Sequence, residues 1–444
     1  MWSVELGVRS YMSIYSGLMK TARSAKHKIT SVTQKPVPLS PVRRIGHVAT
    51  KQRLCAMTFD DGPCLLPPSE NPGGFPLTLE LINTLEKHGA FGTFDVVGDT
   101  SGNYPDKKGR ERTASWGGIR YDHYPDIDRD KFGGAGRAAE LIETMLKGGH
   151  ALANHGWAHI LFGRKSLVYG KRVYFRNIEE VLNDLGRLHN SIKDAYGYEI
   201  TLARPPHYVD AIPDGFTSYD AYAKMGYTYM AADFDGAGWL PLSSYREEVD
   251  AMVSPMKSQL AENPDALCGQ IIFQKDGFNM ARRTPVADGL PLQLELLDSY
   301  GYKVLTVPEL LAASPFSDVF EDEPVCAAAH ALTRRGYCPV YRDNTLRPDK
   351  ICALGEFYMM MCGREAVLER IETRKPMPRN EHPYFRAARL AKAPDCSSGA
   401  LESPLDATRL DAWCYEHYGA PSGLSGSALP RKEVLTALHA MSGE

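Results

Sequence analysis

Short apolar stretches alternate with amphipathic ones between residues 49 and 313, and this alternation restricts how the chain can fold. Leu54–Phe59 and Phe91–Val97 have the length and apolar composition of buried strands, whereas Leu77–His88 repeats its apolar residues at helical spacing. Strands separated by helices usually lie parallel in one sheet, because each helix returns the chain to the same end of the sheet. We therefore expect an α/β fold with largely parallel strands, of the kind that can close into a barrel.

The segments on either side of this region have a different texture. Residues 1–48 end in a polar, proline-punctuated stretch, which indicates an extension or wrapping arm. Residues 314–444 contain prolines and helical patches without strong strands, which predicts a smaller, mainly helical C-terminal domain. Three segments of that domain each have a Gly-containing loop, a Pro and a helix that begins with charged residues. They indicate an internal repeat and are residues 336–361, 398–418 and 425–441.

Composition excludes several classes of protein. Lys and Arg total 51 and Asp and Glu total 54, so a net charge of −3 gives no reason to expect nucleic-acid binding. No run approaches the roughly 18 apolar residues of a transmembrane segment. No signal peptide is visible, because Glu5 and Arg9 interrupt the segment Trp2–Met19, which we expect to be a short amphipathic docking helix or a frayed terminus. The nine cysteines lack a CxxC pair and predict buried thiols, with one or two disulfides in the C-terminal third as the alternative.

Two groups of polar residues could carry chemistry. Asp60 and Asp61 stand where a strand ends in the turn Gly62-Pro63, and two carboxylates this close need a cation or an Arg nearby. The alternative is a turn whose Asp side chains cap backbone N–H groups. His155 and His159 are four residues apart, which on one helical turn would let both bind a single metal ion. A pair of structural histidines is the alternative here.

Two further motifs could line a cleft. In Arg204-Pro-Pro-His207 the prolines make a stiff segment that can fix Arg204 and leave the backbone N–H of His207 pointing into a cleft. Asp235 follows a predicted strand, and an acidic residue at the carboxyl end of a barrel strand often faces the active site. A rigid loop and a glycine-rich turn, respectively, are the alternatives.

Together and in this order, the motifs resemble those of the polysaccharide deacetylases, metal-dependent carbohydrate esterases that remove N- or O-acetyl groups from glycans. The resemblance covers about residues 49–313 and includes Leu85–Gly98, Lys147–His155 and Tyr300–Val307. It implies a distorted (β/α) barrel.

The resemblance also implies a role for each motif. Asp60 would be the general base and Arg204 would keep it charged, while Asp61 and the two histidines would hold one divalent metal ion, for which zinc suits the donor set. The backbone N–H of His207 would help to stabilise the oxyanion. The candidate residues are Asp60, Arg204, Asp235 and Lys275 for catalysis, Asp61, His155 and His159 for the metal ion, and Pro206, His207 and Trp239 for substrate and oxyanion.

The sequence departs from the family pattern on the side of the general acid. Lys275 stands where the family has a His that protonates the leaving amine, and Gly238 replaces the second Asp of another motif. A Lys with its usual pKa near 10.4 is a poor acid at neutral pH. Three solutions are open: Lys275 has a lowered pKa, His207 or His123 supplies the proton, or the substrate is an O-acetyl ester.

The C-terminal region resembles S-layer homology repeats, which bind secondary cell-wall polysaccharide in bacterial envelopes. The likeness lies in Phe316–Val319, Arg334–Tyr337 and Tyr341–Pro348, with Thr408–Asp411 similar to the start of a ligand-contacting helix. A family-specific helical cap packed on the barrel is the alternative.

The sequence thus predicts a deacetylase for an N-acetylated or O-acetylated glycan such as peptidoglycan or a chitin-like polymer, working in the cell envelope or outside the cell. A non-catalytic glycan-binding envelope protein that lost the general acid is one alternative. A cytoplasmic deacetylase for a small N-acetylated sugar derivative is another. The domain boundaries that we expect are 1–48, 49–313 and 314–444.

Overall fold

One parallel sheet organises the first two thirds of the chain. In the described residues every strand pair of this sheet is parallel, and β2 lies between β3 and β10 while also pairing with β11. The strand order is β1 (Arg44–Ile45), β8 (Thr228–Met230), β7 (Leu202–Ala203), β6 (Ala151–Asn154), β3 (Gly92–Val96), β2 (Leu54–Asp60), β10 (Ile271–Lys275) and β9 (Phe234–Asp235), with β11 (Lys303–Leu305) beside β2.

The computed structural model describes residues 37–99, 115–116, 119–120, 130, 133–164, 174–279, 281–378 and 381–443. The helix expected at Trp2–Met19, most of the long segment between Thr100 and Gly136, and its His123 lie outside these residues. A short antiparallel pair, β4 (Ser115–Trp116) and β5 (Ile119–Arg120), is described within that segment.

The sheet curls into a half-barrel and does not close by strand pairing. Strands β1 and β9 stand at the two ends of the pairing order in the described chain. Gly46, directly after β1, accepts hydrogen bonds from the N–H groups of Asp233 and Ile271, which lie near the other end of that order. The expected barrel is therefore a curled half-barrel whose open side is bridged by loop hydrogen bonds.

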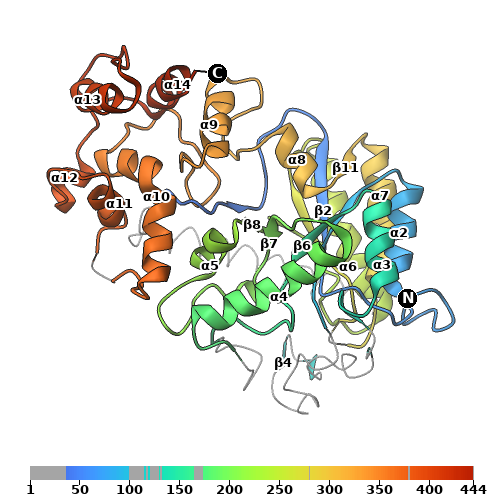
Figure 1. Cartoon of the computed structure of the whole chain (residues 1–444). Helices are drawn as coiled ribbons and strands as arrows, with labels where there is room; N and C mark the ends of the chain where they lie inside the picture. Colours follow the sequence, from blue (N-terminus) through green and yellow to red (C-terminus); the bar gives the residue numbers. More distant parts are fainter. Residues whose placement is uncertain are drawn as a thin grey trace. The chain divides into compact units, whose positions relative to one another are not determined.

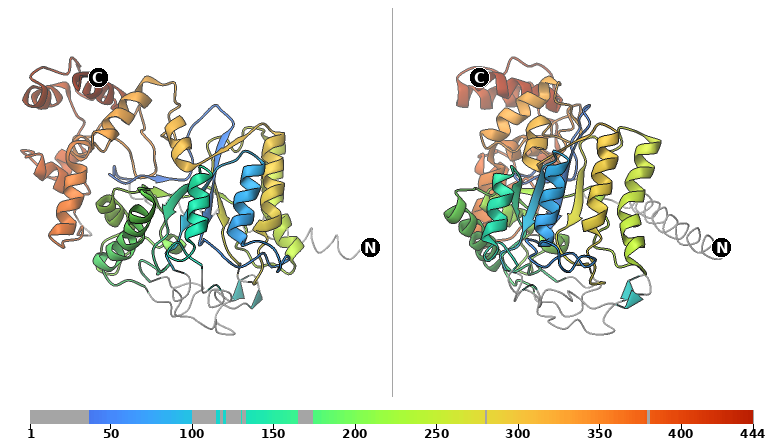
Figure 2. Two further views of the ribbon diagram at one scale, coloured as in Figure 1. Left: turned by 45° about the vertical axis from the view of Figure 1, so that its right-hand side comes forward. Right: turned by 90° about the vertical axis from the view of Figure 1, so that its right-hand side faces the viewer.

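Helices cover the outside of the sheet. Helices α3, α2, α7 and α6 contact one another in that order and form a row along it (Figures 1 and 2). The helices of this part are α2 (Leu77–Lys87), α3 (Ala139–Lys147), α4 (Ile178–Tyr196), α5 (Ser218–Met225), α6 (Tyr245–Glu262), α7 (Val286–Ser299) and α8 (Val307–Ala313), with a short 3-10 turn at Pro206–Tyr208.

Helix α4 shows why the sequence forms these elements. The side chain of Asn177 caps its first turn by accepting a hydrogen bond from Glu180 N–H, and Gly197 ends it with a left-handed φ of 67°. Its buried face repeats at helical spacing: Ile178, Val181, Leu185, Leu188 and Ile192. The carbonyl of Leu185 accepts a hydrogen bond from the side chain of Asn154, so the helix is tied to the last residue of β6. The helix predicted over Leu77–His88 is likewise confirmed, as α2.

The C-terminal residues form short helices around a ring of three backbone hydrogen bonds. Cys352 N–H donates to the Leu429 carbonyl at 2.9 Å, Leu429 N–H to Leu405 at 3.0 Å, and Leu405 N–H to Cys352 at 2.8 Å. Each of these residues stands two positions before a helix begins, and each comes from a different one of the three similar segments. The helices are α9 (Pro324–Arg334), α10 (Leu354–Glu372), α11 (Phe385–Leu390), α12 (Ser398–Glu402), α13 (Ala407–Tyr418) and α14 (Arg431–Met441).

Residues 39–444 form one compact unit, and specific contacts join its helical end to the sheet. Arg370 on α10 forms an ion pair with Asp220 on α5. Ser40 N–H donates to the carbonyl of Val340 at 3.2 Å. All nine cysteines have free thiols. Among the described residues, we find no helix with the length and apolar character needed to cross a membrane.

We predict that Leu185→Ala lowers the free energy of unfolding by about 2–5 kcal/mol, because it leaves a cavity between α4 and the sheet. Leu185 is fully buried, whereas Leu292 on α7 is 43% exposed. The matched variant Leu292→Ala should therefore cost less than about 1 kcal/mol. Chemical denaturation monitored by circular dichroism measures both values, and equal losses would contradict the prediction.

Candidate active site

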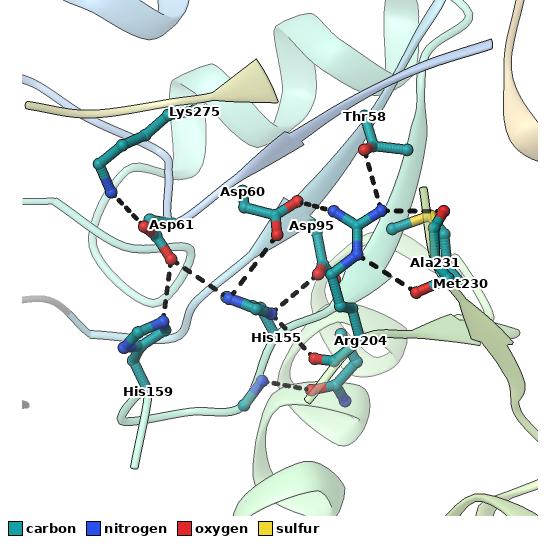
Figure 3. A network of polar contacts seen from close by, with 12 residues as sticks. Thr58, Asp60, Asp61, Asp95, His155, His159, Arg204, Met230, Ala231 and Lys275 are labelled. Carbon is teal, nitrogen blue, oxygen red and sulfur yellow. Dashed lines mark hydrogen bonds and ion pairs between the residues drawn. The ribbon is translucent and has the colours of Figure 1, made fainter. Parts of the chain in front are cut away.

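The predicted polar motifs meet at the carboxyl ends of the central strands (Figure 3). Asp60 ends β2 and Asp61 follows it, while Lys275 ends β10 directly opposite Asp60 in the strand register. His155 follows β6, the next strand but one from β2. Because parallel strands bring their carboxyl ends to the same edge, residues from distant parts of the sequence converge here.

Asp61, His155 and His159 form a candidate metal site. The Oδ1 atom of Asp61 lies 3.2 Å from Nε2 of His155 and 2.9 Å from Nε2 of His159, and one ligand atom from each residue lies within 4.8 Å of the others. Ligands at about 2.1 Å from a tetrahedral zinc ion stand roughly 3.4 Å apart, so the donors are already close to a binding arrangement. Two imidazoles and a carboxylate fit a divalent metal ion.

The two histidines meet through an irregular turn and not along a helix, which corrects our expectation of a helical turn. Residues 155–159 leave β6 without helical structure, and His159 has a left-handed φ of 49°. The carboxylate of Asp184 on α4 accepts hydrogen bonds from the N–H groups of Trp157 at 2.8 Å and Ala158 at 3.3 Å. Burial raises the pKa of Asp184 to about 6, although these hydrogen bonds oppose the shift. Asp184 thus holds the turn that brings the histidine rings together.

Asp60 is buried beside an equally buried arginine. One terminal nitrogen of Arg204 donates to Asp60, the other donates to Thr58 Oγ1 at 3.0 Å, and Nε donates to the carbonyl of Met230 at 3.2 Å. Burial raises the pKa of Asp60 to about 6, while the Arg204 charge opposes the shift and Asp95 adds to it. The carboxylate is therefore charged at neutral pH but more basic than an exposed Asp.

Lys275 is bound to the candidate metal ligand itself. Its ammonium donates to Oδ2 of Asp61, the oxygen turned away from the two histidines (Figure 3). Burial alone would raise the pKa of Asp61, but Lys275 and His159 lower it well below its usual value. Lys275 thus neutralises the same carboxylate that would hold a metal ion.

The remaining predicted residues lie around this centre. His207 follows Pro206 with a left-handed φ of 56°, and its ring centroid is 5.3 Å from that of His159. Trp239 donates its indole N–H to both carboxylate oxygens of Asp235 at 3.0 Å, so these two residues pair with each other. The strand register sets Asp235 on β9 opposite Phe273, two residues before Lys275 on β10.

Sequence reasoning missed a third carboxylate of the site, which lies beside His155. Asp95 is the last residue but one of β3, fully buried and opposite Asp60 in the strand register. Its Oδ2 atom is 2.8 Å from Nδ1 of His155. The signal was present, because a charged residue interrupts the otherwise apolar segment Phe91–Val97.

A curled parallel sheet with an Asp-His-His donor set at its carboxyl edge defines a class of α/β proteins that can bind a divalent metal ion. Residues 47–230 match the model of the family described as polysaccharide deacetylase.

The chain is also similar to two curated proteins. Over 263 residues the chain is 27% identical to the peptidoglycan-N-acetylmuramic acid deacetylase PdaC of Bacillus subtilis, covering 59% of this chain and 40% of the relative. Over 282 residues it is 24% identical to the peptidoglycan-N-acetylglucosamine deacetylase PgdA of Listeria monocytogenes, covering 63% of this chain and 44% of the relative. The chain spans about two fifths of the length of these relatives. A solved structure of the B. subtilis peptidoglycan deacetylase aligns with 21% identity and a TM-score of 0.38, covering 59% of this chain and 91% of that structure.

We predict that zinc binding strengthens as the pH rises. Burial lowers the pKa of His155, but Asp95 and Asp61 together raise it well above 6.5, so its Nε2 must lose a proton before it can bind a metal ion. The affinity should increase by up to about tenfold per pH unit between pH 6 and 8, with proton release on binding. Competition with a chelator gives the affinity, and calorimetry in buffers of different ionisation enthalpy gives the proton count. An affinity that does not change with pH would contradict this.

Proposed function

We propose that the chain is a metal-dependent hydrolase that removes acetyl groups from an N-acetylated or O-acetylated glycan, such as peptidoglycan or a chitin-like polymer. The observation that carries the proposal is the buried Asp60–Arg204 pair next to the donor set of Asp61, His155 and His159. The peptidoglycan deacetylases among its relatives support this substrate class.

Asp60 is the proposed general base. With a pKa of about 6 it is ionised at neutral pH yet basic enough to take a proton from the attacking water. Arg204 keeps this carboxylate in place and charged. A divalent ion, which we propose to be zinc held by Asp61, His155 and His159, would supply Lewis acidity and lower the pKa of water.

The other candidate residues have proposed roles at the substrate. The backbone N–H of His207, whose position is set by Pro206 and by the left-handed conformation of His207, would donate to the oxyanion that develops from the acetyl carbonyl oxygen. Trp239, whose indole is fixed by Asp235, would contact the sugar ring.

The group that delivers a proton to the leaving group must differ from the His of the family pattern, because Lys275 stands at that position. We propose Lys275 as the donor, since its ammonium already lies at Asp61. His207 as the donor, or an O-acetyl ester as the substrate, stays an alternative. The binding of Lys275 to Asp61 also supports a second candidate function, a glycan-binding protein that keeps the cleft without turnover.

We further propose that the protein acts in the cell envelope and that residues 314–444 bind secondary cell-wall polysaccharide, as S-layer homology repeats do. The ring of hydrogen bonds among Cys352, Leu405 and Leu429 supports a repeated unit there. The division into 1–48, 49–313 and 314–444 stays a prediction.

We predict that the zinc-loaded protein releases acetate from N-acetylglucosamine oligomers or from an acetylated glycan ester. Asp60→Asn should lower kcat by roughly 100- to 10,000-fold, because the general base is removed while the shape is kept. The matched variant Asp265→Asn removes a carboxylate that is 65% exposed and should leave the rate unchanged. Acetate measured by a coupled assay decides the matter. Equal rates for Asp60→Asn and wild type would contradict the proposed base.

A second prediction separates the two candidate functions. If Lys275 donates the proton, Lys275→Met should lose roughly 100-fold or more in kcat, whereas Lys275→His should keep or raise it, because an imidazole has a pKa closer to neutral. For a glycan-binding protein without turnover, wild type and Lys275→Met release no acetate. In that case glycan affinity, measured by calorimetry, is the property that persists.

A further inference from the structure

Asp95 is a buried carboxylate in an unusual position. It has no solvent exposure and is the last residue but one of β3, near the carboxyl end of the strand. Within the described residues, neither of its oxygens receives a hydrogen bond of good geometry. Burying a charge without hydrogen bonds is costly, so a residue of this kind calls for an explanation beyond packing.

The nearest charged groups are the two that the candidate site depends on. Asp95 Oδ2 lies 2.8 Å from Nδ1 of His155, and its charge also acts on Arg204. Arg204 already has Asp60, Thr58 and backbone carbonyls as partners. His155 is therefore the group for which Asp95 makes the larger difference.

The two ring nitrogens of His155 face different environments (Figure 3). Nε2 faces Asp61 Oδ1, where a metal ion would be held. When Nε2 binds the metal ion, the single proton of the neutral ring must sit on Nδ1. Nδ1 lies 2.9 Å from the Arg204 carbonyl and 2.8 Å from Asp95. The Arg204 carbonyl is the hydrogen-bond partner of Nδ1, while the negative charge of Asp95 beside it stabilises the proton on Nδ1 and makes the opposite nitrogen a better donor to a metal ion.

We propose that Asp95 is a positioning residue that keeps the ring proton of His155 on Nδ1 and thereby presents Nε2 to the metal ion. The inference rests on the proposed metal-dependent function and adds a residue behind the three candidate ligands. A simpler role, in which Asp95 only balances the charge of Arg204, makes a different prediction for metal binding.

The test compares zinc affinity by chelator competition in three folded variants. Asp95→Leu removes the carboxylate and should weaken zinc binding by roughly 10- to 100-fold, and Asp95→Asn, which keeps an oxygen acceptor, should fall between it and wild type. The control is Glu248→Gln, which alters another fully buried carboxylate, bonded to Arg283 and to Leu242 N–H. Its affinity should stay within twofold of wild type.

A second readout reports the proton itself. The ¹⁵N chemical shifts of the His155 ring in zinc-loaded protein should show a single Nδ1–H tautomer in wild type and a weaker Nδ1–H hydrogen bond in Asp95→Asn. This readout does not depend on activity and would not move if Asp95 had only a packing role. Should Asp95→Leu fail to fold, Asp95→Asn and its spectrum decide the question.

The outcomes separate the inference from the function on which it rests. If wild type and both Asp95 variants bind zinc with equal affinity and have the same spectra, the proposed role of Asp95 is wrong, whereas the proposed metal site is supported. Wild type that binds no divalent ion overturns the proposed function and this inference with it. Graded loss of affinity from wild type through Asp95→Asn to Asp95→Leu supports both.

Discussion

Two adjacent carboxylates at the end of β2 determine which charged groups must surround them. Asp60 and Asp61 would repel each other strongly in a buried site unless each had its own cation. Asp60 pairs with Arg204, which reaches it from the segment after β7, whereas Asp61 faces two histidines on one side and Lys275 on the other. The curled parallel sheet makes this division feasible, because it brings the ends of four strands to one edge.

The sequence allowed much of this arrangement to be predicted. Strand β2 and helix α2 follow from apolar patterning, and the meeting of Asp61 with His155 and His159 was implied by the resemblance to the deacetylase family. The contact between Lys275 and Asp61 could not be predicted, since it depends on the register between β2 and β10, which residue spacing along the chain does not fix.

Supporting residues were the harder part of the site. In the sequence, Asp184 falls among the polar positions of α4, where a carboxylate is ordinarily exposed to solvent. Only the tertiary fold shows that it faces the loop that follows β6. The hydrogen-bonded ring of Cys352, Leu405 and Leu429 likewise depends on the tertiary fold. The pattern of loop, Pro and helix predicted three similar units, but not that their equivalent backbone positions bond to one another in a cycle.

Charge balance connects Asp95 and Lys275 to the chemistry. The three carboxylates of the site (Asp60, Asp61 and Asp95) are balanced by Arg204 and Lys275. The two histidines add positive charge, since the surrounding acids raise the pKa of His155 and His159 lowers the pKa of Asp61. A divalent ion held by Asp61, His155 and His159 would require both imidazoles to be neutral, so the three carboxylates would face Arg204, Lys275 and the ion, with one surplus positive charge. A buried surplus of this kind favours negative charge that develops on a reacting carbonyl oxygen, and its effect is large because little water screens it. Lys275 adds one positive charge to the site and the Asp95 carboxylate adds one negative charge. The charges of these two residues therefore offset each other across the candidate metal site.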